Sequence, residues 1–210
     1  MLSDFLTAND TFFIQGQRLY LRSMQARDVD AWIALRTESQ DYLKPWEPTW
    51  APNALSREAF RRRLKYFTRT ARDDNCYALL IFRITDDILI GGLTMNNVRR
   101  GVTQSASLGY WIGQPYAGKH FMTEAVVATV KYAFLNMGLH RVEAACLSDN
   151  EPSARVLINA GFREEGFARA YRRINGEWQD HRLFGIINGD PLPAFEMITG
   201  RNRADKLTSF

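Results

Sequence analysis

The sequence has few cysteines, no long apolar run and no internal repeat, and each absence excludes a class of protein. Its two cysteines, Cys76 and Cys146, lie far apart, which excludes a disulfide framework and a cysteine-rich metal site. No stretch approaches the roughly 18 consecutive apolar residues that a membrane-spanning helix needs. The first residues lack the basic and apolar segments of a signal peptide. We therefore expect a cytoplasmic protein with reduced thiols and neither a membrane nor a metal partner.

What remains is the composition of an ordinary globular domain. Hydrophobic residues make up 46% of the chain and charged residues 24%, so a disordered chain is not expected. A length of 210 residues suffices for one domain with a full hydrophobic core. The net charge of +4 favours anionic partners such as phosphorylated cofactors or RNA, without choosing between them.

The densest run of basic residues predicts an amphipathic helix that begins near Ser56. Apolar residues recur between the cations at helical spacing, which favours one buried face and a solvated basic back. Contact with RNA or with the ribosome is the alternative function of the same run. The cations of this run are Arg61, Arg62, Arg63, Lys65, Arg69 and Arg72.

Strands dominate the first half of the chain, and strands then alternate with helices, which predicts a mixed α/β domain. Alternating or apolar runs predict strands over residues 18–22, 77–83, 88–95 and 106–112, and a helix over 26–38. Residues 42–52 hold three prolines and two tryptophans, so they are expected to form a loop.

The second half of the chain shows the most regular patterns. Apolar residues from Met122 to Met137 recur at helical spacing, and Gly138 suits the end of that helix. A strand is expected over 141–147, followed by a helix that Asn150 caps. The dipeptide Asn175-Gly176 indicates a hairpin between strands at 167–173 and 181–187, which leaves a loop longer than two residues.

The segment from Gly113 to His120, between an expected strand and an expected helix, has the features of a phosphate-binding loop. Such a loop exposes backbone N–H groups and the positive end of the helix, and Lys119 adds a cation. A plain strand-to-helix turn is the alternative. The spacing also gives most of a nucleotide-binding P-loop, but His120 stands where Ser or Thr would hold magnesium. No apolar strand ends in a convincing magnesium-binding Asp either, which disfavours an NTPase.

Six segments around and including this loop form a series along the chain: LRSMQARDVDAW, YLKPWEPTW, IGGLTMNNVRRG, LGYWIGQPYAGKHFMTEAV, LHRVEAACLSDNEPSARVLINAGFREEG and INGEWQDHRLF. Together they resemble the GNAT superfamily of N-acetyltransferases, in the RimJ/RimL branch that modifies ribosomal proteins. The resemblance implies the GNAT acyl-CoA N-acyltransferase fold, an α/β (α+β) arrangement whose mixed central sheet carries helices on both faces. It covers residues 17–188 and leaves 1–16 and 189–210 as N-terminal and C-terminal extensions.

The resemblance implies acetyl-CoA (coenzyme A) as co-substrate, with no metal. The family's loop consensus, Gln/Arg-x-x-Gly-x-Gly/Ala, falls on residues 115–120, where Gly118 matches and Pro115 and His120 depart. Asn150 and Ser153 match the family's Asn-x-x-Ser, whose side chains reach the cofactor. The expected cofactor-binding residues are Trp111 and Ile112 beside the pantetheine arm, the backbone of Ala117, Gly118, Lys119, His120, Phe121, Met122 and Thr123 around the pyrophosphate, and Asn150 and Ser153.

The resemblance indicates the catalytic residues less clearly than the cofactor-binding residues. Many superfamily members carry a Tyr seven residues after the Asn as general acid, but this chain has Leu157 there. Ser153, or a water that it orients, is therefore the candidate acid. Glu143, on the strand expected beside the acetyl group, is the candidate base, although a solvent-facing strand residue explains it as well. The pair Asp180-His181 is a further candidate base, which an ion pair at a strand start explains equally well.

The resemblance implies acetyl transfer to an amine, with the N-terminal α-amine of a protein such as a ribosomal protein as the expected acceptor. An antibiotic or polyamine acetyltransferase is the alternative within this class, because the fold fixes the donor better than the acceptor. A non-catalytic RNA- or ribosome-binding module that retains a CoA site is the alternative from another class. Residues 42–50 are expected to line the acceptor groove, direct nucleic-acid binding is disfavoured but left open, and a monomer or homodimer is expected.

Overall fold

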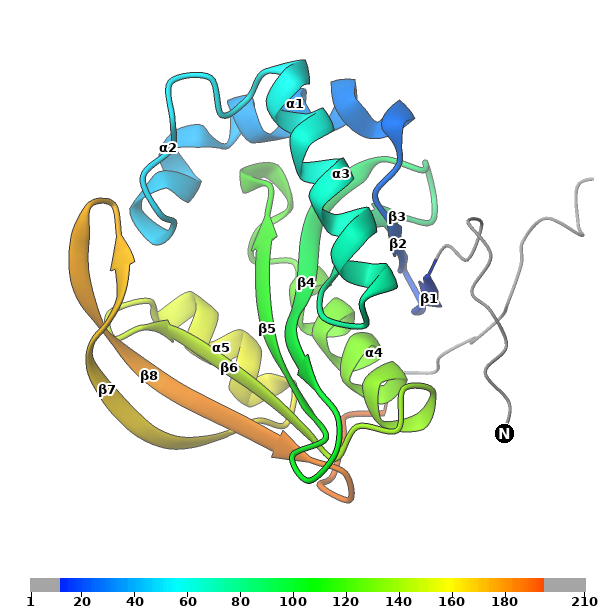
Figure 1. The fold of residues 1–210 in the computed structure, drawn as a ribbon, viewed down its shortest axis with the longest axis vertical. Helices are drawn as coiled ribbons and strands as arrows, with labels where there is room; N and C mark the ends of the chain where they lie inside the picture. Colours follow the sequence, from blue (N-terminus) through cyan, green and yellow to red (C-terminus); the bar gives the residue numbers. More distant parts are fainter. Residues whose placement is uncertain (1–11, 195–210) are drawn as a thin grey trace, which may run out of the picture.

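The computed structural model describes residues 12–194, and its centre is one eight-stranded mixed sheet (Figure 1). The strand order is β1-β2-β3-β4-β5-β6-β8-β7. Neighbouring strands are antiparallel except β5 and β6, which are parallel. The strands are β1 (Phe13–Gln15), β2 (Leu19–Ser23), β3 (Tyr77–Arg83), β4 (Leu89–Arg99), β5 (Ser105–Ile112), β6 (Arg141–Leu147), β7 (Arg163–Ile174) and β8 (Glu177–Ile187).

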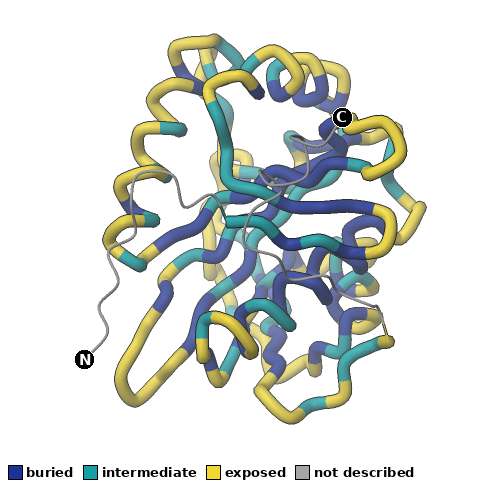
Figure 2. The backbone as a smooth tube through the Cα atoms, turned by 90° about the vertical axis from the view of Figure 1, so that its right-hand side faces the viewer, coloured by how far each residue is buried: buried dark blue, intermediate teal, exposed yellow. Residues whose placement is uncertain are grey.

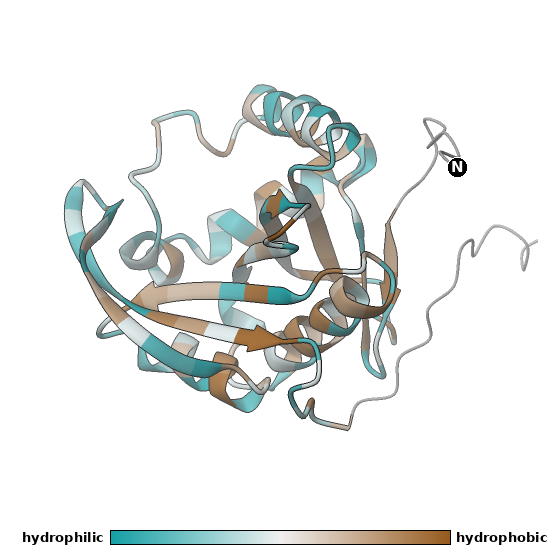
Figure 3. Ribbon diagram, turned by 60° about the horizontal axis from the view of Figure 1, so that its bottom comes forward, coloured by the Kyte–Doolittle hydropathy of each residue, from teal (hydrophilic) through white to brown (hydrophobic). Residues whose placement is uncertain are grey.

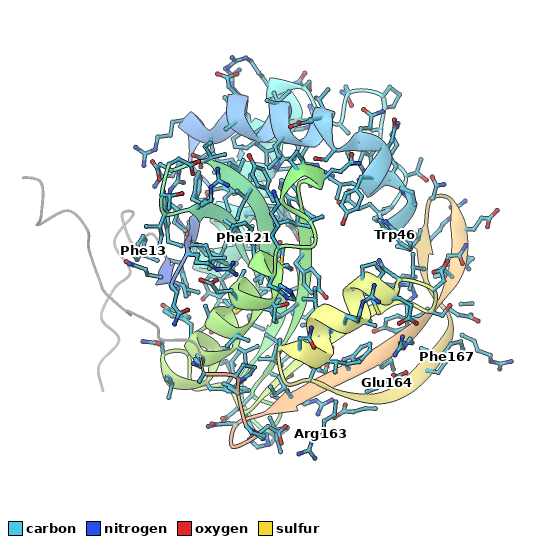
Figure 4. All side chains as sticks on the ribbon, turned by 180° about the vertical axis from the view of Figure 1, so that it is seen from behind. Phe13, Trp46, Phe121, Arg163, Glu164 and Phe167 are labelled. Atoms are coloured by element: carbon cyan, nitrogen blue, oxygen red, sulfur yellow. The ribbon has the colours of Figure 1, made fainter. Side chains whose placement is uncertain are left out.

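Helices cover both faces of this sheet, as predicted. Figures 1 and 4 view the molecule from opposite sides: α3 lies in front of the sheet in Figure 1, and α4 and α5 lie in front of it in Figure 4. The helices are α1 (Val29–Glu38), α2 (Gln40–Leu43), α3 (Arg57–Arg72), α4 (Phe121–Leu135) and α5 (Glu151–Asn159). Three short 3-10 turns, η1 (Ala26–Asp28), η2 (Lys44–Trp46) and η3 (Gln114–Tyr116), connect them to the rest of the chain.

Two hydrophobic clusters hold the helices on the sheet, because successive strand residues point to opposite faces. In β3, Leu79 and Ile81 belong to the cluster that includes α4 and α5. Leu80 and Phe82, one residue further along in each case, pack with α1 and α3 instead. Figure 2 shows buried residues concentrated in the central strands, with exposed residues in the connecting loops.

Helix α4 is buried almost throughout, including the carboxylate of Glu124, which is 0% exposed. Arg18 satisfies that carboxylate twice, with its backbone N–H and with its guanidinium Nε, each at 2.8 Å. A second nitrogen of the same guanidinium donates to the carbonyl of Lys119 at 3.2 Å. Arg18 therefore ties the N-terminal end of α4 and the loop before it to the edge of the sheet.

The amphipathic helix predicted from the basic run is α3, which the side chain of Ser56 caps by accepting a hydrogen bond from the N–H of Ala59 at 3.0 Å. Phe60 is fully buried against α1 and the sheet. Arg61, Lys65 and Arg69 lie on the exposed side. The prediction of a buried apolar face and a solvated basic back is confirmed.

The prediction of a long loop in the last hairpin is wrong. Strands β7 and β8 reach the turn, and their connection is the dipeptide Asn175-Gly176. Both residues have positive φ, 45° and 90°, as a tight two-residue turn requires. In Figure 3, the residues at the far end of this hairpin are coloured mainly as hydrophilic. Without an apolar alternation, the sequence does not mark where these strands end.

Two further segments differ from the expectation. Residues 40–46, partly within the expected loop at 42–52, form α2 and the turn η2. Residues 13–15, within the expected N-terminal extension, form β1, which pairs with β2. Residues 1–11 and 195–210 of the two expected extensions lie outside the described residues. No helix in the described part of the chain has the length and apolar character to cross a membrane.

Candidate active site

The parallel pair at the centre of the sheet opens into a cleft. Strands β5 and β6 pair over Ser105–Leu108 and Arg141–Ala144 and then diverge. Beyond that point β5 continues along β4 to Ile112, and β6 continues along β8 to Leu147. A cavity of about 600 Å³ occupies this gap and extends along it. Phe121 and Trp46, labelled in Figure 4, both line it.

Segments that lie far apart in the sequence build this cleft. One side comes from the α2 segment and the end of β5, and another from the N-terminal end of α4. The C-terminal end of β6, helix α5 and the β7–β8 hairpin complete it. The lining residues fall within 42–48, 108–112, 116–123, 145–147, 150–159, 172–174 and at 181.

The N-terminal end of α4 lies at the cleft, where the sequence predicts a phosphate-binding loop. The first backbone hydrogen bond of the helix runs from the N–H of Glu124 to the carbonyl of His120, at 3.2 Å. The N–H groups of residues 121–123 therefore have no acceptor within the helix. Gly118 and His120 both have positive φ, 72° and 61°, which turns the loop back onto the helix start. These groups suit the pyrophosphate of coenzyme A.

Six of the seven expected loop residues line the cleft, and Lys119 does not. Its ammonium group donates to the carbonyl of Pro115 at 2.8 Å, within the loop itself. Lys119 thus stabilises the loop conformation, while the backbone N–H groups face the cleft.

Trp111, Ile112, Asn150 and Ser153 also line the cleft, so the structure brings together the other predicted cofactor residues. The side-chain oxygen of Asn150 accepts a hydrogen bond from the N–H of Ser153 at 3.1 Å, as an N-cap does. This contact fixes the start of α5, and with it the position of the Ser153 hydroxyl.

Tyr110 also lines the cleft, although no sequence motif indicates it. Its hydroxyl lies 2.9 Å from Oγ of Ser153 and also donates to the Ser153 carbonyl at 3.2 Å. Burial raises the pKa of Tyr110 above its usual value, so its proton is held at neutral pH. The Cys146 thiol also contacts Ser153, and burial raises its pKa to about 11. Tyr110, Ser153 and Cys146 form one hydrogen-bonded group on the α5 side of the cleft.

The structure does not bring Glu143 to this cleft. Its exposed carboxylate pairs with Arg141 at 2.8 Å and lines a separate cavity of about 340 Å³. Glu143 points away from the α5 side, where Ala144 packs, and it pairs with Ser107 of β5 before the gap between the two strands opens. Of the second candidate pair, His181 does line the cleft and is 3% exposed.

The tryptophan-rich segment, where the acceptor groove is expected, forms one end of the cleft, which we name the acceptor end. Tyr42, Trp46 and Glu47 line it. Arg36 holds the Glu47 carboxylate with one guanidinium nitrogen at 3.1 Å, and Trp50 donates to the same carboxylate at 2.8 Å. The hairpin closes this end, because the N–H of Asn175 donates to the carbonyl of Glu47 at 3.0 Å.

A mixed sheet with helices on both faces, a gap between diverging parallel strands and an anion-binding helix start define an acyl-CoA N-acyltransferase. The sequence profile of the family described as Acetyltransferase (GNAT) domain matches residues 18–163, and the chain belongs to this family. It is an acetyl-CoA-dependent N-acetyltransferase. Among residues 12–194, no group of three or more His, Cys, Asp or Glu side chains is arranged to hold a metal ion.

Three relatives show how far the similarity extends. The chain is 36% identical to a probable N-acetyltransferase, YjcK, of Bacillus subtilis over 84% of its own length and 98% of that protein. It is 31% identical to the ribosomal protein uS5-alanine N-acetyltransferase of Escherichia coli over 84% of this chain and 91% of that one. The solved structure of Mycobacterium smegmatis RimJ in complex with CoA-disulfide superposes with a TM-score of 0.79, at 30% identity, covering 84% of this chain and 86% of that one.

Proposed function

We propose that this enzyme acetylates the N-terminal α-amine of a protein, with a ribosomal protein as the first candidate. The observation that carries the proposal is the similarity along 84% of the chain to an enzyme named for the alanine of a ribosomal protein. The cleft supports it, because its acceptor end is framed by α2, the segment after it and the tip of the β7–β8 hairpin. A chain end can enter such a frame, whereas the rest of a folded substrate stays outside.

The ionisation of the acceptor favours an α-amine over a lysine. An α-amine with a pKa of about 7.7–8.0 is roughly 10–15% neutral at pH 7, whereas a lysine with a pKa near 10.4 is about 0.04% neutral. The difference corresponds to about 3 kcal/mol of deprotonation. The carboxylate that lines the acceptor end, Glu47, is already bound to Arg36 and Trp50. The cleft is thus better equipped for an amine that is partly neutral in solution.

The side chains on the α5 side of the cleft suit protonation of the departing thiolate. Ser153 is the proposed general acid, and Tyr110 lies within hydrogen-bond distance to replace its proton. The backbone of β5 beyond Leu108 faces the gap without a β6 partner in the described structure, and offers N–H groups to the oxyanion. Acetyl-CoA, when bound, supplies the activated thioester.

Cys146 does not suit the role of a nucleophile in this site. The thiolate is the reactive form of cysteine, and with a pKa of about 11 the thiol is protonated at neutral pH. The proposed reaction is therefore direct transfer from thioester to amine, with both substrates bound, and involves no acetylated cysteine.

Mass spectrometry of one peptide that carries both a free N-terminal alanine and an internal lysine tests this function. After incubation with enzyme and acetyl-CoA, we expect the acetyl group on the N-terminal nitrogen. The control is the same peptide with its N-terminus blocked, which should stay unmodified. Acetylation of the lysine in either peptide would contradict the proposed acceptor.

The same assay separates the two alternative functions. Acetylation of an aminoglycoside or a polyamine, with no product on either peptide, would indicate a small-molecule acetyltransferase. Binding of acetyl-CoA without transfer to any amine would leave the RNA- or ribosome-binding module. In that case the exposed cations of α3 (Arg61, Lys65 and Arg69) are the residues to replace in an RNA-binding assay.

A further inference from the structure

We infer that His181 is the general base of this enzyme, which accepts the proton that the attacking amine loses. The inference rests on the proposed acetyl transfer to an amine, but it does not depend on which amine is the acceptor. Four features of the structure support it. They are the hydrogen bond of the imidazole, its position on the sheet, the groups around it, and the fact that the other candidate bases are hydrogen-bonded or lie elsewhere.

The hydrogen bond of His181 leaves one ring nitrogen free to accept a proton. Nδ1 lies 2.9 Å from the backbone carbonyl of Gln179. A carbonyl oxygen only accepts hydrogen bonds, so Nδ1 carries the hydrogen and Nε2 keeps its lone pair. This arrangement fixes the tautomer and the ring orientation of a base that acts through Nε2.

The register of the sheet places His181 across the gap from the proposed acid. His181 is paired with Leu147, and Leu183 with Ala145, in the β6–β8 ladder. Paired residues on neighbouring strands lie on the same face, so these four side chains share one face of the sheet. Cys146, between Ala145 and Leu147, points to the α5 face, where it contacts Ser153.

His181 and Ser153 nevertheless line the same cleft, because the gap between β5 and β6 connects the two faces. A thioester held in this gap has the acid on its α5 side. An amine that approaches from the acceptor end reaches the carbonyl from the other side, where His181 lies. The two proton transfers are thereby separated in space.

The surroundings of His181 keep the imidazole neutral. Burial lowers its pKa below the usual 6.5, and the positive charge of Arg172 on β7 acts in the same direction. The Gln179 carbonyl and Asp180 on β8 oppose this, but the net pKa is lowered. From β7, the Tyr171 ring packs edge-on at 5.5 Å between ring centroids. The other titratable or charged groups that line the cleft are Tyr42, Glu47, Tyr110, Tyr116, His120, Cys146, Arg155 and Arg173.

The other candidate bases are engaged or lie elsewhere. Both oxygens of Glu47 are bound, by Arg36 and Trp50. Glu143 faces a different cavity. His120 stands exposed at the start of α4, at the end of the cleft that suits the pyrophosphate. Among these groups, His181 combines a free lone pair with burial at the cleft.

The reaction then balances with two residues of this chain. As the amine nitrogen bonds to the thioester carbonyl carbon, Nε2 of His181 takes one proton from that nitrogen. As the carbon–sulfur bond breaks, Ser153 gives one proton to the sulfur, and Tyr110 restores the Ser153 hydroxyl. Solvent exchange returns His181 and Tyr110 to their starting states, so no further reactant is needed.

The test compares His181→Ala, His181→Asn and the matched control His140→Ala, which replaces an exposed histidine on the loop before β6. Each enzyme is assayed across pH with whichever amine the wild type acetylates. We expect kcat of the wild type to fall on the acid side, through a midpoint below 6.5, as His181 becomes protonated. Both His181 variants should lose about 10²–10⁴-fold in kcat and lose this acid limb. Their affinity for acetyl-CoA, measured by titration calorimetry, and the profile of His140→Ala should match the wild type.

Added imidazole should restore part of the activity of His181→Ala, because it supplies a base where the side chain is missing. If the alanine variant does not fold, the asparagine variant decides, since its amide nitrogen matches Nδ1 and can donate to the Gln179 carbonyl but cannot take the proton. A folded His181 variant that keeps the acid limb, or keeps kcat within a few-fold of the wild type, would overturn the inference. A wild type that acetylates no amine would instead overturn the proposed function.

Discussion

At the scale of single residues, the pair Tyr110 and Ser153 gives the sharpest test of the acid. Ser153→Ala removes the proposed donor, so we expect kcat to fall about 10²-fold or more. Tyr110→Phe keeps the ring but removes the hydroxyl that restores the proton, so a smaller loss, of about 10-fold, is expected. Because the two residues act as a unit, the double variant should be little worse than Ser153→Ala alone. The measurement is release of free thiol at saturating acetyl-CoA.

Tyr66→Phe is the matched control for that series, since Tyr66 is half-exposed on α3, away from the cleft. Fully additive losses in the double variant would show that Tyr110 and Ser153 act independently and would contradict the relay. An unchanged kcat in Ser153→Ala would remove Ser153 as the acid.

The same pair shows what the sequence alone can give at this scale. Asn150 and Ser153 are recognisable because they lie three residues apart in one motif. Tyr110 lies 43 residues from Ser153, and only the sheet brings them together. The placement of Glu143 fails for a related reason. Glu143 pairs with Ser107 of β5, where the two strands are still joined and the gap has not yet opened. Strand alternation does not show where along β6 this pairing ends.

At the scale of secondary-structure elements, the start of α4 combines an exposed imidazole with a left-handed backbone. His120 has φ of 61°, a conformation that costs a side chain with a Cβ about 1–2 kcal/mol relative to glycine. We therefore expect His120→Gly to raise the free energy of unfolding by about 1 kcal/mol, and the melting temperature by about 2–4 °C. The Michaelis constant for acetyl-CoA should stay the same or fall, because the smaller residue leaves the backbone N–H groups more accessible.

His120→Ala separates conformation from side-chain loss, since alanine also lacks the imidazole but keeps a Cβ. The free energy of unfolding of His120→Ala should not exceed that of the wild type. If both variants raise the Michaelis constant for acetyl-CoA, then the imidazole itself contacts a phosphate.

The elements that sequence patterns predicted well are those with at least one buried face. Helix α3 carries an apolar stripe because a buried face imposes helical spacing, and the central strands β3 and β4 are apolar along most of their length. Strand β7 is exposed along nearly all of its length, so burial leaves no pattern in its sequence. The three residues of β1 are too few to show an alternation. The prolines of residues 42–52 predict a loop, but α2 and the turn η2 form there, because the first turn of a helix tolerates proline.

At the scale of the whole molecule, the acceptor end of the cleft depends on a contact between distant parts of the chain. The tip of the β7–β8 hairpin meets the segment after α2, where Asn175 donates to the Glu47 carbonyl. A Cβ added at Gly176 would lie 3.7 Å from the hydroxyl of Thr49. The fold thus brings the C-terminal half of the sheet against the N-terminal helical layer, and in the proposed function the acceptor passes between them.

Gly176→Ala tests whether this contact shapes the acceptor site. Gly176 has φ of 90°, which alanine adopts only with strain, so the hairpin tip should shift away from residues 47–49. Because a peptide would contact this frame and a small amine would not, we expect a higher Michaelis constant for peptide acceptors. The values for small amines and for acetyl-CoA should stay unchanged. Gly189→Ala is the matched control: its φ is 110°, its Cβ would meet nothing within 4 Å, and it does not line the cleft. Both variants should lose about 1–2 kcal/mol of stability, and equal effects on peptide kinetics would refute a role of the hairpin tip in holding the acceptor.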